Sequence, residues 1–422
     1  MIYDAIVIGA RCAGAATAML LARQGHRVLL VDRATFPSDI PHGHLIHRRG
    51  PQRLAQWELL DRVLATGCPP LTNITHEVGD ITLVAHDVSV GGVPAACGPR
   101  RTALDRVLTD AAVEAGVELR AGFSVESLTR DGDRVTGIRG GDRRGGTMTS
   151  ERATIVIGAD GRNSHLARAV GAPAYEEVPS LTCWYFSYWA DVPSVGLEIY
   201  DRHGRAIFAF PTNDGLFAIF VAWPASELPA VRADIERQFL AAIDGVPHLG
   251  ERVRSGRRAE RFYGATDLRN FLRRPYGPGW ALVGDAGCHK DPYLALGVCD
   301  AFRDAELLAT AVSSALAGQR ALDDALADYE TRRNEATLPE YRVNLERARF
   351  TPLRAQEREL RAALAGNPEA TTQLYLTIEG FAPREAFFNP DNLGRIFAAQ
   401  AMSFRARTSR SDAAVEESPS SR

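Results

Sequence analysis

The residues best suited to do chemistry lie in a glycine loop near the start of the chain. Gly9-Ala-Arg-Cys-Ala-Gly14 stands between an apolar, β-branched run and an Ala/Leu-rich segment. Glycines at a strand-to-helix turn let the backbone approach a pyrophosphate and let the helix pack closely on the strand. Asp32 ends the next apolar run, 18 residues past Gly14, where its carboxylate can accept a hydrogen bond from a ribose hydroxyl. The loop predicts a dinucleotide site, and the acidic residue favours a ribose without a 2′-phosphate.

Arg11 departs from the usual glycine loop, because it stands where the pattern GxGxxG has its middle glycine. A Cβ at this position narrows the approach to the pyrophosphate, although the guanidinium can itself reach a phosphate. The alternative interpretation is an ordinary strand-to-helix turn of another α/β protein. We favour the nucleotide site because a complete strand–helix–strand pattern surrounds the loop.

The segments around these residues predict an α/β fold. Residues 3–8 and 26–31 resemble strands buried on both faces, and residues 13–24 between them a helix, which makes one βαβ unit. Two more buried strands are expected at 154–158 and 280–284. Helices are expected at 51–65, 102–115, 230–243 and 297–317, and in most of the chain from there to about 404, with interruptions at Pro339, Pro352, Pro368 and Pro383.

The stretch from 181 to 223 is rich in aromatic residues and predicts an antiparallel sheet, because strand-type runs alternate with Asn-Asp-Gly and Asp-Arg-His-Gly turns. One face of such a sheet packs on the core, and the other can form a substrate pocket. Tyr185, Tyr188 and Phe210 are the pocket candidates, with plain packing as the alternative. No general base can be named from the sequence.

Composition narrows the class of protein. Hydrophobic residues make up 45% and charged residues 24%, as in globular proteins, and the formal net charge is −3. Without a basic excess to track a phosphate backbone, nucleic acid is not an expected partner. No apolar run approaches the roughly 18 residues that span a bilayer. Six cysteines without a CxxC pair, and an N-terminus without a signal-peptide pattern, predict a reducing, cytoplasmic location.

Two further motifs extend the pattern of the glycine loop. Gly158-Ala-Asp160-Gly161 follows one expected strand, and residues 284–304, Gly-Asp-Ala-Gly-Cys-His-Lys-Asp-Pro-Tyr-Leu-Ala-Leu-Gly-Val-Cys-Asp-Ala-Phe-Arg-Asp, follow another. In order and spacing, up to about residue 320, the three motifs resemble those of FAD-dependent class A monooxygenases with the para-hydroxybenzoate hydroxylase-like fold. The wider set that they resemble includes geranylgeranyl reductases and flavin-dependent halogenases.

The resemblance implies which residues contact FAD. Those expected at the ADP half are Gly9, Gly14 and Asp32, those at the sugar chain are Gly284 and Asp285, and those along the flavin ring are Pro292 and residues 294–298, with Gly297 among them. Charged residues near the motifs complete the expected set of cofactor contacts: Arg11, Arg33, Arg48, Arg100, Arg101 and Asp160.

The resemblance also implies the domain organisation. We predict an α/β protein with a Rossmann-like FAD-binding domain, an interleaved antiparallel-sheet (α+β) substrate domain and a helical C-terminus. The expected ranges are 1–72, 95–180 and 272–350 for the FAD-binding domain, 73–94 and 181–271 for the substrate domain, 351–404 for the C-terminal helical region and 405–422 for a disordered tail.

The ring-side motif has one feature that follows from physics and one departure from the family. A helix that begins near Gly297 would aim its N-terminal amides at the turn 291–296 and stabilise negative charge on the reduced flavin. Leu296 stands where the family more often has glutamine. No second glycine loop is present, so NAD(P)H would dock transiently, or a separate reductase would deliver the electrons.

Histidines and cysteines near the motifs have ordinary alternatives. His42, His44 and His47 form His-x-His-x-x-His, but without a nearby carboxylate or cysteine ligand we expect no metal. Cys288 and Cys299 flank the ring-side loop and are expected to be small buried hydrophobic residues rather than a redox pair.

Lys290 is the only lysine of the chain, among 49 basic residues, and lies six residues past Gly284. Halogenases of this fold need a lysine between flavin and substrate, but their lysine lies early in the chain, and their Trp-x-Trp-x-Ile-Pro motif is missing here. The alternative, which we favour, is a loop lysine that contacts FAD or a neighbouring carboxylate such as Asp291. Lys290 is therefore a position to test rather than an assigned catalytic residue.

The expected function is that of an FAD-dependent monooxygenase. NAD(P)H and O2 would be used to hydroxylate or epoxidise an apolar or aromatic small molecule, in specialised metabolism. The alternatives are a flavin-dependent reductase or oxidase that transfers hydride without oxygen insertion, and a non-catalytic nucleotide-binding protein. The oligomeric state stays open, with a homodimer among the options.

Overall fold

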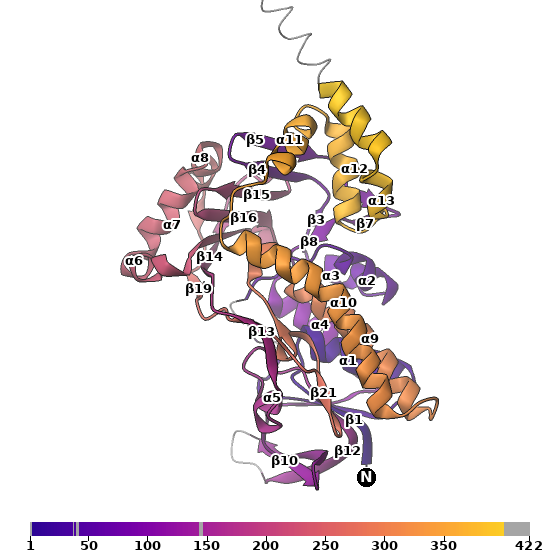
Figure 1. The fold of residues 1–422 in the computed structure, drawn as a ribbon. Helices are drawn as coiled ribbons and strands as arrows, with labels where there is room; N and C mark the ends of the chain where they lie inside the picture. Colours follow the sequence, from indigo (N-terminus) through magenta and orange to yellow (C-terminus); the bar gives the residue numbers. More distant parts are fainter. Residues whose placement is uncertain (1, 37, 39–41, 143–146, 401–422) are drawn as a thin grey trace, which may run out of the picture.

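The computed structural model describes residues 2–36, 38, 42–142 and 147–400, and its two large sheets lie at opposite ends of the molecule (Figure 1). The long helices α9 (Gly297–Leu316) and α10 (Leu322–Ala348) run alongside each other, and α10 reaches from one end towards the other. The disordered tail expected at 405–422 lies outside the described residues.

The first sheet is mixed and has a parallel centre, as long β-branched runs buried on both faces predict. Its parallel strands lie in the order β22 (Trp280–Leu282), β12 (Thr149–Gly158), β1 (Ile2–Ile8), β2 (Val28–Asp32) and β9 (Glu118–Ala121). The antiparallel additions are β11 (Arg134–Asp142), β10 (Phe123–Asp131) and β21 (Tyr276–Gly277).

Helices cover one face of this sheet. Side chains alternate along each strand, so neighbouring residues contribute to the cores on opposite faces. Ala5 and Val7 of β1 belong to a core shared with α1 (Cys12–Arg23), α4 (Arg101–Glu114) and α9. Ile6 and Ile8 face the other way, into a smaller core with Leu166 and Trp280. The βαβ unit expected around the glycine loop is therefore present.

The second sheet is mostly antiparallel, and its strands lie in the order β18 (Arg257–Arg258), β14 (Thr182–Ala190), β17 (Phe217–Pro224), β16 (Arg205–Pro211), β15 (Leu197–Arg202), β4 (Ile74–Val78) and β5 (Ile81–Ala85), with β19 (Tyr263–Ala265) also on β14. The pairing of β15 with β4 is parallel, which the sequence did not predict. Strands far apart in the chain thus join one sheet.

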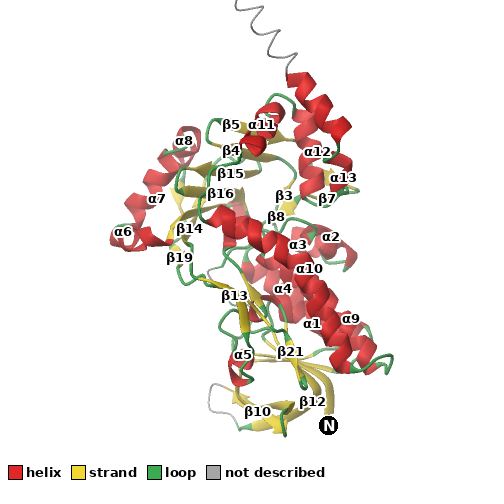
Figure 2. Ribbon diagram, in the orientation of Figure 1, coloured by secondary structure: helices red, strands yellow, loops and turns green. Residues whose placement is uncertain are grey.

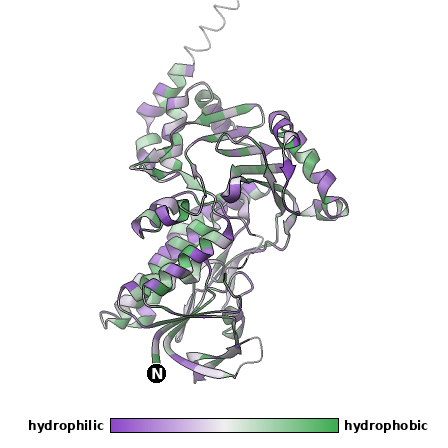
Figure 3. Cartoon of the chain, turned by 180° about the vertical axis from the view of Figure 1, so that it is seen from behind, coloured by the Kyte–Doolittle hydropathy of each residue, from purple (hydrophilic) through white to green (hydrophobic). Residues whose placement is uncertain are grey.

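Each face of the second sheet packs against different helices (Figure 2). One face shares a core with α11 (Ala355–Leu364) and α12 (Pro368–Ile378), and the other with α6 (Leu228–Ala233), α7 (Ile235–Asp244) and α8 (Pro247–Ser255). Apolar and polar residues alternate along these covering helices when they are coloured by hydropathy (Figure 3). A sheet covered on both sides has no solvated face, so every pocket candidate on it is buried.

Proline positions show where sequence reasoning failed and where it succeeded. α10 continues through Pro339, so the interruption expected there is wrong. The exposed Pro339 removes one backbone hydrogen bond, but the packing of the rest of α10 holds the helix together. Pro368 and Pro383 do lie at helix starts, where the missing N–H costs nothing.

The remaining elements are short: α2 (Gly50–Gln56), α3 (Leu60–Leu64), α5 (His165–Ala169), α13 (Arg384–Phe387), β3 (Pro70–Leu71), β6 (Ser89–Val90), β7 (Val93–Pro94), β8 (Ala96–Cys97), β13 (Ala174–Val178), β20 (Asn270–Arg273), β23 (Cys288–His289), and the 3-10 turns η1 (Asn213–Gly215), η2 (Ala225–Glu227), η3 (Gly284–Ala286) and η4 (Pro292–Leu294). The α/β class with an added sheet and a helical C-terminus is confirmed. None of the described helices has the length and apolar character that a bilayer crossing requires.

Candidate functional site

The carboxyl ends of four parallel strands bring the predicted motifs to one edge of the mixed sheet. β1, β2, β12 and β22 end at or just before the glycine loop, Asp32, the Asp160 turn and η3. Backbone hydrogen bonds hold these turns together: Gly9 N–H donates to Val31 O at 2.7 Å, and Ala159 N–H donates to Ile8 O at 2.8 Å. Ligands of open α/β sheets bind at this edge, so the topology alone makes it the candidate site.

The glycine loop needs glycine at both ends. Gly9 has φ of +102°, in the left-handed region, and a Cβ there would press on the Ala159 carbonyl group. A Cβ on Gly14 would overlap the Gly9 carbonyl oxygen. The two glycines therefore keep α1 close to β1, and the loop remains an open cradle of backbone amides at the helix start.

Asp32 organises the loop as well as facing the site. Its Oδ2 accepts a hydrogen bond from Ala10 N–H at 2.7 Å, and its Oδ1 accepts one from Ala34 N–H at 2.7 Å. Carboxylate oxygens have further lone pairs, so ribose hydroxyls can still donate to them. Arg33, the next residue, is exposed at the same edge.

Arg11 and Arg101 share one buried carboxylate that sequence reasoning missed. Arg11 Nη1 lies 2.6 Å from Asp105 Oδ2, and Arg101 Nη2 lies 2.9 Å from Asp105 Oδ1. Two guanidinium groups on one carboxylate leave a net positive charge, which suits a pyrophosphate. The signal was present in the sequence, because Arg101 and Asp105 are four residues apart and lie on one face of a helix.

The Asp160 turn carries two buried polar atoms without a hydrogen-bond partner in the described protein. Asp160 Oδ2 accepts from the N–H of His165, the first residue of α5, at 2.6 Å, but its Oδ1 is unpaired, as is Arg162 Nε. Buried polar atoms are rarely left unpaired, so this turn suits a polar ligand. His42 is exposed at the surface, but partial desolvation by nearby protein atoms and the charges of Arg101 and Arg162 lower its pKa below its usual range.

The ring-side loop runs from η3 to the start of α9 and contains Asp285, Pro292 and Gly297. Asp285 is half-buried and close enough to Arg101 to interact with its charge. A Cβ on Gly297 would meet no protein atom, so the space over the first turn of α9 is open. Val298 packs in the core of the first sheet, and Leu294 and Ala295 pack against the core of the second, so the open space of this loop lies at Gly297.

Asp291 ties this loop to the second sheet. The Thr182 hydroxyl, at the start of β14, donates to Asp291 Oδ2 at 2.7 Å, and Tyr293 N–H donates to Oδ1 at 3.2 Å. Burial raises the pKa of Asp291 to about 6, although these hydrogen bonds oppose the rise. The loop therefore has a fixed position between the two sheets.

Lys290 pairs with the carboxylate of Asp300 rather than with that of the adjacent Asp291. Its Nζ lies 2.6 Å from Asp300 Oδ2, in the first turn of α9, and its side chain is only 4% exposed. The contact is a close ion pair rather than a well-directed hydrogen bond. Sequence reasoning favoured a contact with FAD or a neighbouring carboxylate and named Asp291 as an example; the described partner is Asp300.

Arg48 is not brought to the arginines of the glycine loop. Its Nη1 contacts Glu340 Oε1 of α10 at 2.5 Å, and its backbone N–H donates to Glu379 Oε2 at 2.6 Å. The neighbouring His47 Nε2 lies 3.0 Å from the Leu294 carbonyl oxygen. These residues join the ring-side loop to the C-terminal helices.

The aromatic face of the second sheet surrounds His44. Ring centroids of Tyr188, Phe210 and Phe220 lie 5.8, 5.3 and 5.6 Å from the imidazole. His44 Nδ1 lies 3.0 Å from Gly98 O, which can only accept, so Nδ1 carries the proton and Nε2 accepts from the Tyr188 hydroxyl at 3.0 Å. Burial lowers the pKa of His44 to about 3, so the imidazole is neutral.

Tyr185 is not brought together with the other two pocket candidates. It belongs to the core on the opposite face, where its ring centroid lies 6.3 Å from that of Trp223 and the cluster packs on α7. Tyr188 and Phe210 belong to the face that carries His44. Residues 185 and 188 differ by an odd number, so strand alternation places them on opposite faces.

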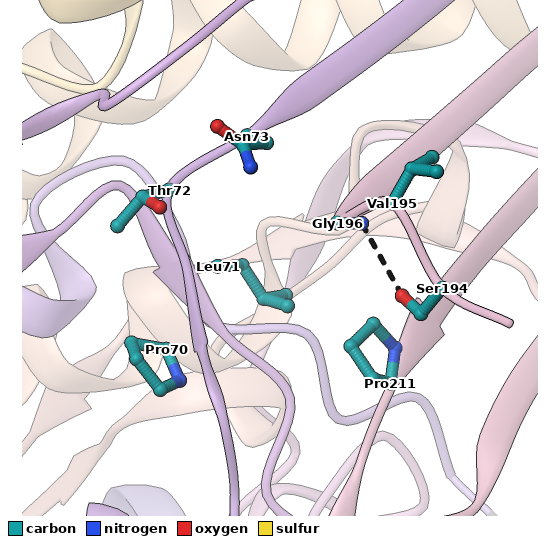
Figure 4. Close-up of a pocket in the computed structure, with 8 residues that line it drawn as sticks. All are labelled: Pro70, Leu71, Thr72, Asn73, Ser194, Val195, Gly196 and Pro211. Atoms are coloured by element: carbon teal, nitrogen blue, oxygen red, sulfur yellow. Dashed lines mark hydrogen bonds between the residues drawn. The ribbon is translucent and has the colours of Figure 1, made fainter.

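A separate surface pocket of about 300 Å³ lies beside β3 and the residues that immediately precede β15 (Figure 4). Its lining residues are Pro70, Leu71, Thr72, Asn73, Ser194, Val195, Gly196 and Pro211. Ser194 Oγ accepts a hydrogen bond from Gly196 N–H at 3.2 Å. None of these side chains titrates near neutral pH, so the pocket offers no acid–base chemistry.

Neither metal nor disulfide chemistry is apparent among the described residues. They contain no group of three or more His, Cys, Asp and Glu side chains placed to hold a metal. The six cysteines are free thiols, and burial raises the pKa of Cys12 and Cys299 to about 12. Burial also raises the pKa of Cys288, to about 11, so Cys288 and Cys299 carry no thiolate at neutral pH.

Taken together, the sheet edge, the glycine cradle, the paired arginines and the second sheet define a dinucleotide-binding protein with an added substrate sheet. The residues present fit FAD: backbone amides and two cations for the pyrophosphate, carboxylates for hydroxyls, and unpaired atoms at Asp160 and Arg162. The FAD binding domain family matches residues 2–338, so the chain belongs to that family and its cofactor is FAD.

Curated relatives place the chain among enzymes of this family. It is 27% identical over 411 residues to kynurenine 3-monooxygenase of Salinispora arenicola, covering 88% of this chain and 87% of the relative. It is 25% identical over 348 residues to digeranylgeranylglycerophospholipid reductase of Methanocella arvoryzae, covering 79% and 83%. The resemblance drawn from the three motifs is confirmed, and the chain is an FAD-dependent oxidoreductase.

Solved structures agree on the fold. The myxobacterial chondrochloren halogenase CndH superposes with a TM-score of 0.74 at 20% identity, covering 94% of this chain and 97% of that one. PqsL of Pseudomonas aeruginosa superposes with a TM-score of 0.67 at 24% identity, covering 90% and 99%. At these identities the likeness concerns the fold.

Proposed function

We propose that this chain is an FAD-dependent monooxygenase that uses NAD(P)H and O2 to insert one oxygen atom into an apolar or aromatic small molecule. The observation that carries the proposal is the aromatic face of the second sheet, which contains one buried hydrogen-bonded pair, Tyr188 and His44. Strand β14 of this sheet is joined to the ring-side loop by the hydrogen bond between Thr182 and Asp291. Apolar walls with few polar groups are typical of pockets for such substrates.

Bound FAD supplies the redox chemistry, accepting hydride from NAD(P)H and activating O2. The chain's own residues hold and enclose it. Arg11 and Arg101 would neutralise the pyrophosphate, Asp32 and Asp285 would accept hydrogen bonds from hydroxyls, and the first turn of α9 would direct amides to the ring. The aromatic face and Tyr293 would exclude water from the reacting centre.

The Tyr188–His44 pair would orient the substrate rather than remove a proton. The Gly98 carbonyl fixes the His44 tautomer, and a neutral imidazole with a strongly lowered pKa is a poor proton acceptor at neutral pH. Tyr188 would therefore keep its proton directed at His44. The aromatic face that contains Tyr188 and His44 therefore suits a substrate that needs no deprotonation by the protein, such as an electron-rich ring.

A reductase is the second candidate, because similarity to the digeranylgeranylglycerophospholipid reductase covers 79% of this chain. Halogenation is less well supported, although the chain is 25% identical over 347 residues to tryptophan 2-halogenase of Chondromyces crocatus. The sole lysine is buried in an ion pair with Asp300.

The test begins with the visible spectrum of the purified protein, which should show bound flavin. Candidate aromatic and polyketide-like compounds are then screened for compound-dependent NAD(P)H oxidation and O2 uptake. A product heavier by one oxygen atom supports the monooxygenase. A product that has gained two hydrogens supports the reductase, and a halogenated product in the presence of halide supports the third reading. A colourless protein that also fails to take up added FAD would overturn all three.

A cytoplasmic location and a homodimer remain proposals of the same kind. The reducing compartment is supported by six free cysteines. Sedimentation of the FAD-loaded protein would decide between monomer and dimer.

A further inference from the structure

Lys290 places an ammonium group at a buried position, where desolvation of the charge is unfavourable. It lies in the ring-side loop between η3 and η4, with 4% of its side chain exposed, and Asp300 is the carboxylate within 4 Å of its Nζ. Burial opposes its charge, but the Asp300 carboxylate outweighs burial and raises the pKa of Lys290. The chain uses arginine at the other 48 basic positions, so a compact cation is placed here in particular.

Asp300 lies in the first turn of α9, where its charge acts on the positive end of the helix dipole. Its Oδ1 contacts Arg303 Nη1 at 2.7 Å, while Arg303 also contacts Asp304 Oδ1 at 2.7 Å. Arg303 is thus shared between two carboxylates. Without Lys290, Asp300 would be only partly neutralised, and its negative charge would oppose the field of the α9 N-terminus.

The same helix start faces the open space of the ring-side loop. A Cβ on Gly297 would meet no protein atom, and the loop that carries Lys290 ends at this residue. Reduction of a flavin by two electrons increases its negative charge or its proton count, so fields from nearby fixed charges change the stability of the reduced form more than that of the oxidised form.

We propose that the Lys290–Asp300 ion pair is a charge-balancing device that sets the reduction potential of the bound flavin through the N-terminus of α9. Lys290 is a positioning residue in this proposal and not a catalytic one. The proposal rests on FAD binding and on the ring-side loop lying against the flavin. It does not depend on which substrate the enzyme oxidises.

The proposal predicts shifts of opposite sign, which a purely structural role would not give. Lys290→Met leaves a negative charge near the helix start, so reduced FAD should bind about tenfold more weakly relative to oxidised FAD. For a two-electron couple this ratio corresponds to a midpoint potential about 30 mV lower. Asp300→Asn leaves a positive charge, so the ratio and the potential should shift the other way. The double variant should return to within about twofold of the wild-type ratio.

The experiment measures the midpoint potential and the affinity for oxidised FAD of each FAD-loaded variant, with thermal unfolding as a check of the fold. Arg53→Met is the matched control, because Arg53 Nε pairs with Glu306 Oε2 of the same helix at 2.8 Å, about two turns further along. Its potential should stay at the wild-type value.

Unchanged potentials in both single variants, shifts of the same sign, or a double variant that keeps the shift would each overturn the proposal. If Lys290→Met does not fold, Asp300→Asn alone still decides, since its potential must rise. Failure of the proposed function looks different: FAD-loaded protein would not turn over with NAD(P)H and any candidate substrate, while the potentials of the variants would still be shifted.

Discussion

The Tyr188 hydroxyl donates a hydrogen bond of 3.0 Å to His44 Nε2, and this bond joins strand β14 to the loop that precedes α2. His44 is held from the other side by the Gly98 carbonyl oxygen at 3.0 Å, so neither ring nitrogen is left over. The pair links the aromatic sheet to the part of the chain that contains the cofactor motifs.

Tyr188→Phe should uncouple cofactor oxidation from product formation. The substitution leaves buried His44 Nε2 without its donor, which costs about 1–3 kcal/mol in unfolding free energy. If the aromatic face around His44 shifts, the substrate is bound in a less productive position, and we expect about tenfold less product per NAD(P)H consumed. FAD affinity should not change.

Tyr185→Phe is the matched control for this prediction, since it removes the same hydroxyl group from the opposite face of β14. Its product yield should equal that of the wild type. Equal yields for both variants would show that the Tyr188 hydroxyl does not position the substrate.

Gly297→Ala should lower FAD affinity without lowering the stability of the apoprotein. Since an added Cβ at Gly297 meets no protein atom, the apoprotein should keep its stability, while FAD affinity should fall about tenfold or more because the Cβ occupies cofactor space. Gly14→Ala should instead destabilise the apoprotein, because its Cβ would overlap the Gly9 carbonyl oxygen. Calorimetry and FAD titration check both; undiminished FAD affinity in Gly297→Ala would mean that FAD does not reach the start of α9.

Arg101→Met should weaken FAD binding by about 10- to 100-fold, the loss expected for one or two hydrogen bonds to a charged group. Because the interaction is electrostatic, the loss should shrink as salt is added. Arg106→Met is the control on the same helix: Arg106 is exposed and pairs with Asp110 at 3.6 Å. If both variants bind FAD like the wild type, the pyrophosphate does not lie at the Arg11–Arg101 pair.

Sequence reasoning succeeded where the signal was local. The glycine loop, Asp32 and the helix start at Gly297 each follow from a few adjacent residues, and the structure has β1, α1, β2 and α9 near the expected ranges. The odd spacing of residues 185 and 188 places the two tyrosines on opposite faces of the strand, so only one of them can share the face of Phe210.

The remaining features depend on how distant segments meet. The partner of Lys290 is Asp300, which the fold brings close although Asp291 is the adjacent carboxylate in the sequence. The parallel pairing of β4 with β15 depends on strands more than 100 residues apart in the sequence. The domain boundaries stay a prediction for the same reason: no local signal marks where the chain passes from one sheet to the other.

Asp291→Asn should become more stable relative to the wild type as pH rises from about 4 to 6. The folded state raises the pKa of Asp291 from 3.8 to about 6, so in this window the folded wild type holds a proton that the unfolded chain has lost. Its stability therefore falls with rising pH, by at most about 3 kcal/mol for two pKa units, and the amide lacks this dependence.

Chemical denaturation at several pH values checks this slope, because a constant offset from the altered hydrogen bond with Thr182 cancels in it. Asp201→Asn is the control: His76 and Tyr293 lower the pKa of Asp201 in spite of burial, so its own window lies below pH 4. A flat difference between Asp291→Asn and wild type from pH 4 to 6 would contradict the raised pKa.

Lys290→Arg should keep the positive charge of the ring-side loop, but the larger guanidinium group should pack poorly at the buried position of the ammonium group. The described contact of Nζ is one carboxylate oxygen at 2.6 Å, whereas a guanidinium group is larger and brings five N–H donors that need acceptors. We expect unfolding free energy to drop by about 1–3 kcal/mol from overpacking and unpaired donors, with the flavin potential near the wild-type value because the charge remains. Lys290→Met, by contrast, should shift the potential, so size and charge are measured separately. Wild-type stability in Lys290→Arg would mean that the site accepts either cation, and the single lysine among 49 basic residues would then have no structural reason.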